Sequence, residues 1–331
     1  MSVFANPLVN SKFGRGLAGW AAGHFSSNPI ILLYHGVSVG PVPGTLTNCE
    51  QKHIPLDAFV EHLRTLKRWR RVVSLQEMVQ GLRGGEDLKK CVAITFDDGY
   101  ENNVLKAAPA LADFNMPAAF FVATGFLGTD RWIWTDQVEM MLDRTVERSV
   151  RVPLEENTLP LLTLDCKLEA LKQIKAALKR LPHAQCLNAV AGIGEQLNVS
   201  AADVTTDGDY RFMSWDQVRS LASAGFEIGA HTINHPILSQ IPVEEAKQEI
   251  LGSRDRINAE LGQCSTTFCY PNGKSSDYTS EIAEFCGQHF RSAVSANRGH
   301  ANARELYELR RFGTPSGARV SNIEWMLLRE R

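Results

Sequence analysis

Two pairs of side chains that could hold a metal ion lie far apart in the sequence. Asp97 and Asp98 stand side by side, and His231 and His235 follow more than 130 residues later. One carboxylate and two imidazoles make three protein ligands, which leaves a coordination position open for water, as in catalytic rather than structural zinc sites. The pattern therefore predicts a split metal site in which the second carboxylate is free to accept a proton.

Each pair follows an apolar run that we expect to form a strand, Cys91–Phe96 for the carboxylates and residues 226–230 for the imidazoles. Parallel α/β folds keep their chemistry at such strand ends. Gly99 allows a turn there, so that one Asp can bind metal while its neighbour takes a proton. An Asp-Asp-Gly triplet alone is more often a simple turn, and a His-x-x-x-His pair often arises by chance. Their combination at two strand ends favours the metal site.

The same residues resemble the motifs of a known family, the polysaccharide deacetylases with a NodB-like domain, carbohydrate esterase family 4. Four segments carry the resemblance: residues 95–99 (Thr-Phe-Asp-Asp-Gly), 231–235 (His-Thr-Ile-Asn-His), 268–273 (Phe-Cys-Tyr-Pro-Asn-Gly) and 33–35 (Leu-Tyr-His). The likeness runs from about residue 30 to residue 312 and is interrupted between residues 125 and 213.

The resemblance implies a fold, a reaction and a role for each motif residue. It implies a distorted (β/α) barrel that hydrolyses N-acetyl groups on sugars. Asp98, His231 and His235 would be the metal ligands, Asp97 the general base, and the backbone N–H of Asn272 an oxyanion donor. Deacetylation needs a nucleophile at neutral pH, and a bound divalent ion lowers the pKa of water from about 15.7 to about 7. The donor set suits zinc first, with cobalt, nickel and iron as alternatives.

One departure from the family pattern concerns the base. Many members have an Arg where this chain has Cys269, and that Arg is thought to keep the base carboxylate ionised. A nearby cation typically lowers the pKa of an Asp by about 1 to 3. Arg310 or Arg311 from the last strand could replace it, but an Arg pair at a strand end is more often solvated, and we favour that interpretation.

A second departure concerns the group that protonates the leaving amine. Other family members have a late Leu-x-His motif, and no such motif follows Phe290 in this chain. His300 lies in a loop rich in Gly and Asn. His35, at the end of the first predicted strand and so on the same rim as Asp97, is the better candidate, as an acid or as a hydrogen-bond partner. The alternative is a buried histidine whose nitrogens are satisfied by the backbone.

Composition limits the class of protein. The chain has 331 residues, 44% of them hydrophobic, enough for one elaborated domain. A net charge of −2 and a pI near 6.5 argue against a dedicated nucleic-acid surface. The seven cysteines are odd in number, scattered and without Cys-x-x-Cys spacing. This usage indicates reduced thiols and favours a cytoplasmic location.

The first 29 residues are interpreted as an N-terminal arm before the catalytic domain of residues 30–331. Residues 1–25 are interrupted by polar and charged side chains and lack the long apolar core of a signal peptide. No stretch of the sequence is apolar enough to predict a transmembrane helix. Residues 17–25 could rest on a membrane surface as a peripheral contact, but a packing arm is the favoured interpretation.

Strands and helices alternate along the chain, which predicts parallel strands in a barrel or an open sheet. We expect strands at Ile30–Tyr34, at residues 118–123 and near Thr266. Helices are expected at Leu56–Trp69 and at residues 215–224 and 242–261, and Pro109 should bend or split a helix that begins at Glu101.

Residues 126–212 form a predicted insertion that is mainly helical and covers part of the active-site rim. Residues 164–181 and 184–197 should make a helical pair separated by Pro182. Trp132 and Trp134, just past a strand end, could stack on sugar rings. Packing in the core of the insertion is the favoured alternative.

Together these features predict a metal-dependent hydrolase that removes an N-acetyl group from an amino sugar or glycan. A deformylase or another C–N amide hydrolase on the same scaffold is one alternative. A catalytically silent glycan-binding protein is another, kept open by the missing Arg and the missing late His. The sequence specifies neither the sugar nor the oligomeric state.

Overall fold

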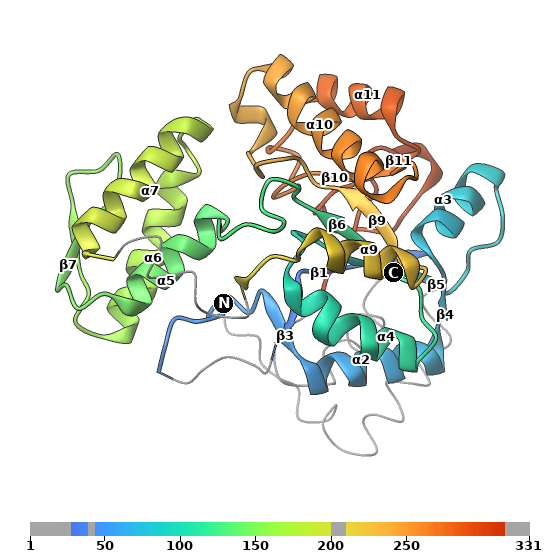
Figure 1. The fold of residues 1–331 in the computed structure, drawn as a ribbon, viewed down its shortest axis with the longest axis horizontal. Coiled ribbons are helices and arrows are strands. Elements are labelled where there is room, and N and C mark those ends of the chain that lie inside the picture. Colours follow the sequence, from blue (N-terminus) through green and yellow to red (C-terminus); the bar gives the residue numbers. More distant parts are fainter. Residues whose placement is uncertain (1–27, 39–43, 200–209, 315–331) are drawn as a thin grey trace.

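The computed structural model describes residues 28–38, 44–199 and 210–314 (Figure 1). The predicted N-terminal arm lies outside the described residues except for its last two positions, so the suggested membrane contact of residues 17–25 falls there as well. No helix in the described part of the chain is both long enough and apolar enough to cross a membrane. All seven cysteines, each within the described segments, are free thiols.

The described residues form an eight-stranded parallel sheet at the centre of the molecule (Figure 1). Its strands lie in the following order: β11 (Ser292–Val294), β10 (Thr267–Cys269), β9 (Glu227–Ala230), β6 (Ala119–Val122), β5 (Cys91–Phe96), β1 (Ile30–Tyr34) and β12 (Phe312–Gly313). The eighth strand, β4 (Arg71–Val72), pairs with the beginning of β5.

The end of the described chain connects the two edges of this sheet. Leu309 pairs with Val294 on β11, while Phe312 and Gly313 pair with Leu32 and Leu33 on β1. The sheet is therefore curled into a barrel that is closed only by this short segment. The predicted distorted (β/α) barrel is confirmed.

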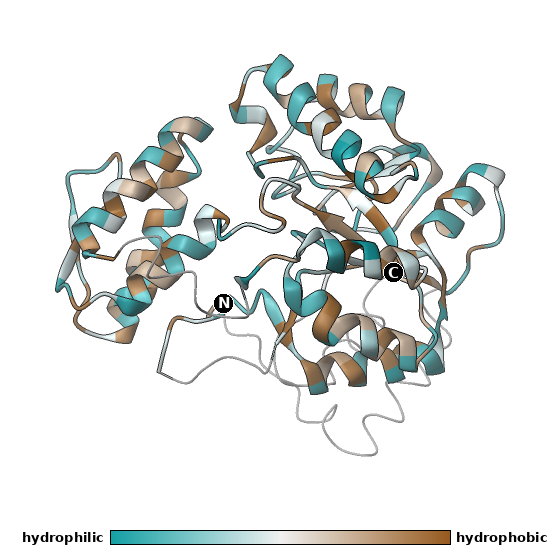
Figure 2. Cartoon of the chain, in the orientation of Figure 1, coloured by the Kyte–Doolittle hydropathy of each residue, from teal (hydrophilic) through white to brown (hydrophobic). Residues whose placement is uncertain are grey.

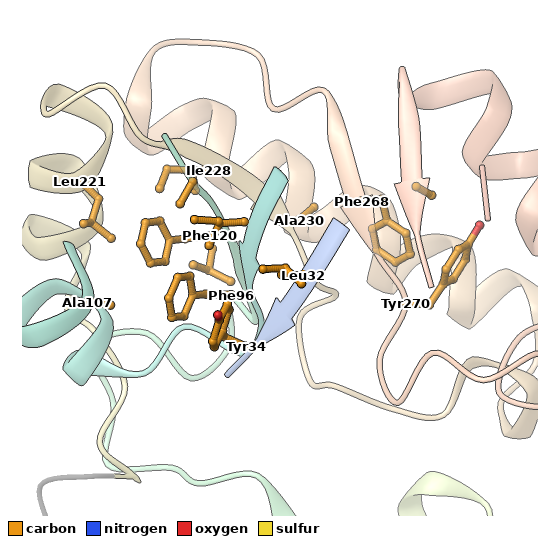
Figure 3. Close-up of a cluster of buried hydrophobic side chains, with 14 of the residues drawn as sticks. Leu32, Tyr34, Phe96, Ala107, Phe120, Leu221, Ile228, Ala230, Phe268 and Tyr270 are labelled. Carbon is orange, nitrogen blue, oxygen red and sulfur yellow. The ribbon is translucent and has the colours of Figure 1, made fainter. Parts of the chain in front are cut away.

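The barrel strands are apolar because both of their faces are covered. Every residue of β5 and of β6 is buried, and such near-continuous apolar runs are typical of parallel sheets with helices outside. In the layer between the sheet and its helices the ring of Phe96 stacks between Tyr34, at 5.2 Å, and Phe120, at 5.0 Å, as Figure 3 shows. Burial of each large apolar side chain stabilises the fold by about 1.5–3 kcal/mol.

Helices pack around the sheet and join its strands. They are α2 (Leu56–Trp69), α3 (Leu75–Gly84), α4 (Ala108–Asp113), α9 (Trp215–Ser223), α10 (Val243–Leu261) and α11 (Ser280–His289). In Figure 2 each of these helices carries both hydrophobic and hydrophilic residues, as amphipathic helices on a sheet do. For the three of these helices whose limits were predicted, α2, α9 and α10, the observed limits agree within one residue, and Ser214 begins α9 in a capping box with Gln217.

The helix predicted after Glu101 is split, as expected from Pro109. Residues Asn103–Ala107 form a π-helical turn, η2, before α4. A proline ring clashes with the carbonyl four residues earlier and removes one N–H donor, which accounts for the widened turn.

The described residues of the segment 126–212, which leave out residues 200–209, include three helices, and the segment lies to one side of the barrel (Figure 1). They are α5 (Trp134–Arg144), α6 (Leu164–Leu178) and α7 (His183–Leu197). A short antiparallel hairpin of β7 (Ser149–Arg151) and β8 (Thr158–Pro160) was not expected. The segment has its own hydrophobic core, in which Trp132 and Trp134 are each only 4% exposed. Core packing is therefore the correct interpretation of these two tryptophans, and a sugar-stacking role is excluded by their burial.

Candidate metal and catalytic site

Strand register places His35 and Asp97 at the same level of the barrel rim. Tyr34 on β1 pairs with Phe96 on β5, so the next residue of each strand leaves the sheet beside the other. The backbone N–H of Asp97 donates to the carbonyl of Tyr34 at 2.9 Å. This confirms the part of the sequence argument that put the two side chains on one rim.

The predicted ligand residues Asp98, His231 and His235 come together at that rim. Asp98 Oδ1 lies 3.3 Å from Nε2 of His231 and 3.3 Å from Nε2 of His235. All three side chains are buried, and their donor atoms all lie within 4.8 Å of one another. Two imidazole nitrogens and a carboxylate oxygen that converge in this way fit one divalent ion with room for a further ligand.

The ring of His231 is oriented by a bond on its other side. His231 Nδ1 lies 2.7 Å from the carbonyl oxygen of Cys269, so Nδ1–H donates and Nε2 is left to face Asp98. Metal-binding histidines commonly donate the second ring nitrogen to a carbonyl or carboxylate, which fixes the tautomer. The contact follows from register, because Ala230 on β9 pairs with Phe268 on β10.

Four residues of the site have left-handed backbone conformations: Asp98 (φ 74°), Thr232 (φ 65°), His235 (φ 55°) and Asn272 (φ 59°). The conformation is uncommon outside glycine and is most unfavourable for a β-branched residue such as Thr232. Strain of this kind persists only where the surrounding structure holds it, and it clusters at functional sites.

Hydrogen bonds with Glu249 and Gly125 hold the His231–His235 loop in this conformation. The carboxylate of Glu249 on α10 accepts from the backbone N–H groups of Ile233 and Asn234, each at 2.8 Å, and from Asn234 Nδ2 at 2.7 Å. On the other side, the N–H of Gly125 donates to the carbonyl of Ile233 at 2.8 Å. A Cβ on Gly125 would lie only 2.7 Å from that carbonyl oxygen, so the close approach requires glycine.

Asp97 is held by Arg311, and the expectation that the Arg310–Arg311 pair is solvated is wrong for Arg311. Its guanidinium is 1% exposed and donates to both carboxylate oxygens, Nη1 to Oδ1 and Nη2 to Oδ2, each at 2.7 Å. Burial alone would raise the pKa of Asp97, but the charge and hydrogen bonds of Arg311 lower it below its ordinary value. Arg310 is half exposed and pairs with Glu305, as a solvated strand-end residue does.

Lys52 is a part of the rim that sequence reasoning missed. It precedes the short strand β3 (His53–Pro55), and its Nζ lies 2.6 Å from Asp136 Oδ1 on α5 and 3.7 Å from Asp98 Oδ2. Asp136 also accepts from the hydroxyl of Tyr100 at 2.6 Å. Lys52 therefore joins the segment 126–212 to the candidate metal ligand Asp98.

His35 and Asn272 both line a cleft of about 690 Å³ together with the carboxylates and imidazoles described above. Burial lowers the pKa of His35, although the charges of Asp98 and Asp97 act to raise it. None of the backbone hydrogen bonds among the described residues uses the N–H of Asn272. His300 does not line the cleft, and its ring packs against Phe312.

Comparison with known proteins agrees with this geometry. The family model described as polysaccharide deacetylase matches residues 84–150 and 169–290, more than half of the 331 residues. The chain belongs to the polysaccharide deacetylase family. A curated relative of this family, YxkH of Bacillus subtilis (strain 168), carries the name of a polysaccharide deacetylase and is 26% identical over 113 residues. That match spans 34% of this chain and 37% of the length of YxkH.

Solved structures with the names of deacetylases share the fold of this chain. PplD of Streptococcus pyogenes, in complex with acetate, has a TM-score of 0.59 and 18% identity, with 91% of this chain and 99% of that chain covered. IcaB from Ammonifex degensii has a TM-score of 0.56 and 17% identity, with 92% and 98% covered. The de-N-acetylase from Aggregatibacter actinomycetemcomitans has a TM-score of 0.52 and 18% identity, with 90% and 98% covered.

The candidate site also contains residues for which the sequence held little signal. Lys52 and Glu249 are single charged residues outside any motif, and only the tertiary structure brings them to the site. For Arg311 a signal existed, because successive residues of an extended segment point to opposite faces. If Arg310 faces solvent, Arg311 must face inward.

Proposed function

We propose that this family member is a metal-dependent hydrolase that removes an N-acetyl group from an amino sugar or glycan. The observation that carries the proposal is the convergence of Asp98, His231 and His235 beside Asp97, a carboxylate that is paired with Arg311. A glycan-binding protein without catalytic activity would have no use for an ionised base next to three metal donors.

Asp98, His231 and His235 would hold the ion. Zinc is the first choice for two imidazoles and one carboxylate, with cobalt, nickel and iron as alternatives. When bound, a divalent ion of this kind activates a water molecule at neutral pH and polarises a carbonyl. Burial alone would raise the pKa of Asp98, but His231, His235 and Lys52 lower it well below its ordinary value, so the ligand stays ionised.

Asp97 is the proposed general base. Arg311 uses one lone-pair direction on each Asp97 oxygen, and a carboxylate has about four such directions, so acceptor capacity remains on the cleft side. A correctly placed base contributes about 10² to 10⁴-fold to the rate. Arg311 keeps the carboxylate ionised so that it can take the proton of the attacking water.

Asn272 and His35 would act on the acetyl group and on the leaving amine. The backbone N–H of Asn272 is the proposed donor to the oxyanion, and the loss of one such donor typically costs about 2.7–4 kcal/mol of transition-state stabilisation. His35 lines the same cleft. Burial lowers the pKa of His35, so it would act as an acid only after it takes up a proton within the cleft, and it can also serve as a hydrogen-bond partner.

The test joins metal analysis to product analysis. We expect the purified protein to bind one divalent ion per chain and to release acetate, not formate, from an N-acetylated amino-sugar panel. Asp98→Ala should lose both the metal and the activity, and chelation should abolish activity that added metal restores. Asp97→Asn should keep the metal and lose about 10² to 10⁴-fold in rate. The exposed Asp113→Asn on α4 is the matched control and should behave as wild type.

Three results would contradict the proposal. Full activity after complete chelation would exclude a role for metal. Release of formate with no acetate would point to a deformylase on the same scaffold. Sugar affinity with bound metal but without release of any acid would show a glycan-binding protein.

A further inference from the structure

The cleft beside Asp97 and Asp98 has two walls. One wall is a face of helix α6, from which Lys172, Lys175 and Lys179 line the cleft. These residues are spaced by three and four positions, so they lie on one side of the helix. The opposite wall includes Lys274 and Arg298, which follow β10 and β11.

The cleft is strongly basic although the chain is not. The whole protein has 35 basic and 37 acidic residues. Among the residues that line the cleft, seven are Lys or Arg and only three are acidic, namely Glu50, Asp97 and Asp98. The basic character is therefore a local property of this site and does not reflect the overall composition.

Three of the basic side chains are neutralised by carboxylates. Arg311 pairs with Asp97, and Lys52 pairs with Asp136. Lys175 lies 2.7 Å from Glu50 and 3.6 Å from Glu139 and is almost fully buried. These three cations are therefore already paired with carboxylates and are not available to a ligand.

Three outer lysines, Lys172, Lys179 and Lys274, are not balanced in this way. Neither Lys179 nor Lys274 forms an ion pair with another described residue, and Lys274 Nζ donates to the carbonyl of Ala296 at 3.1 Å. Lys172 has only the exposed Glu169 of its own helix, at 4.0 Å. Arg298 lies over the ring of Phe312. Positive side chains gathered on two facing walls repel one another, so their arrangement suits an anionic ligand between them.

Resting on the function proposed above, we propose that the substrate is an N-acetylated sugar bearing a phosphate or pyrophosphate group. The sugar lies at Asp97 and Asp98, and the phosphate binds between the lysine face of α6 and the Lys274–Arg298 wall. Lysine ammonium groups bind phosphates as point charges and need no fixed planar geometry, which suits the exposed side chains of Lys172 and Lys179. A soluble nucleotide carrier and a lipid carrier present the same group.

Binding of inorganic pyrophosphate tests the anion site without any use of the reaction. The measurement is calorimetric titration of chelator-treated Asp98→Asn protein, in which the candidate metal site cannot contribute. We expect this protein, in which the cleft lysines are unchanged, to bind pyrophosphate with an affinity that falls as salt is added. The change of both Lys172→Gln and Lys179→Gln should weaken it about tenfold. The double change Lys67→Gln and Lys89→Gln is the matched control, since both residues are exposed and neither lines the cleft.

Absence of pyrophosphate binding, or equal binding by the cleft and control variants, would overturn the proposal even if the protein proves to be a deacetylase.

Steady-state kinetics give a second test of the phosphate site. N-acetylglucosamine 1-phosphate should have a lower KM than N-acetylglucosamine, and the cleft variant should remove this advantage with kcat little changed. Equal KM values for the two sugars in wild type would also overturn it. Competition by a nucleotide diphosphate and by a polyprenyl diphosphate in detergent then identifies the carrier, and each result supports the phosphate site.

Discussion

Arg311 grips both carboxylate oxygens of Asp97 at 2.7 Å, although the two residues are 214 positions apart in the chain. The same guanidinium lies 3.2 Å from the thiol of Cys269, the position at which many family members have an Arg. Arg311, which directly precedes β12, thus reaches Asp97 alongside the smaller side chain of Cys269 on β10. The proposed base Asp97 therefore has a buried positive partner, which comes from a different part of the barrel.

Replacement of Arg311 by Met should reduce both stability and activity. Asp97 is 4% exposed and would be left as a buried charge without a partner, a loss that typically costs about 3–5 kcal/mol. Urea unfolding at pH 7 measures this cost. Arg310→Met removes only a half-exposed pair with Glu305 and should cost less than about 1 kcal/mol. Equal losses of unfolding free energy in the two variants would show that the Arg311–Asp97 pair stabilises the fold no more than an exposed pair does.

The same variant should shift the pH dependence in a defined direction. In the wild type the pKa of Asp97 lies below its unfolded value of about 3.9. The stabilisation from the pair is therefore complete above that value and is lost as pH falls through the folded-state pKa. Without Arg311, burial raises the pKa, so the acid limb of the activity profile should move to higher pH. An unchanged acid limb would show that Asp97 is not the base.

The parts of the structure that follow from local sequence were predictable. The strand Cys91–Phe96 and the helix Leu56–Trp69 have the limits expected from apolar runs and amphipathic spacing. The convergence of Asp98 with His231 was predictable too, because carboxyl ends of parallel strands share one rim.

The parts that depend on tertiary pairing were not predictable in the same way. The burial of Arg311 requires that the last segment pairs with β1 and closes the barrel. Lys52 reaches the rim only because α5 presents Asp136 to it. The β7–β8 hairpin was missed because strands of three residues are too short to show a period of two.

Lys52 and Asp136 should be energetically coupled. Lys52→Met leaves Asp136, which is 1% exposed, without its cation, whereas the double change Lys52→Met with Asp136→Asn removes both charges. A double-mutant cycle by chemical unfolding should therefore give a coupling of about 1–3 kcal/mol. The exposed Lys247–Glu244 pair on α10 is the matched control and should show much weaker coupling. Additive single changes at Lys52 and Asp136 would contradict the inferred link between the segment 126–212 and the rim.

Glu249 should control metal affinity without touching the metal. Glu249→Ala leaves three N–H donors of the His231–His235 loop unpaired, and one buried unpaired donor already costs about 1–3 kcal/mol. Because the loop carries two candidate ligands, metal affinity should fall by about 10- to 100-fold, measured by competition with a chelating dye. Glu245→Ala, at an exposed position of the same helix, should leave the affinity unchanged. A Glu249→Ala protein with wild-type affinity would show that the strained loop holds its shape alone.

His35 can be tested by the choice of leaving group. If it delivers a proton to the departing amine, His35→Ala should lower kcat on an N-acetyl sugar by about 10² to 10⁴-fold, with metal content and unfolding midpoint unchanged. An activated aryl acetate leaves without protonation, so the variant should hydrolyse it nearly as fast as wild type. Equal losses on the amide and the ester would instead make His35 a residue that positions Asp97 or Asp98. Unchanged turnover on both substrates would remove His35 from the mechanism. The proton would then have to reach the amine from another group of the cleft, and Asp97, which is protonated once water has attacked, is a candidate on the same rim.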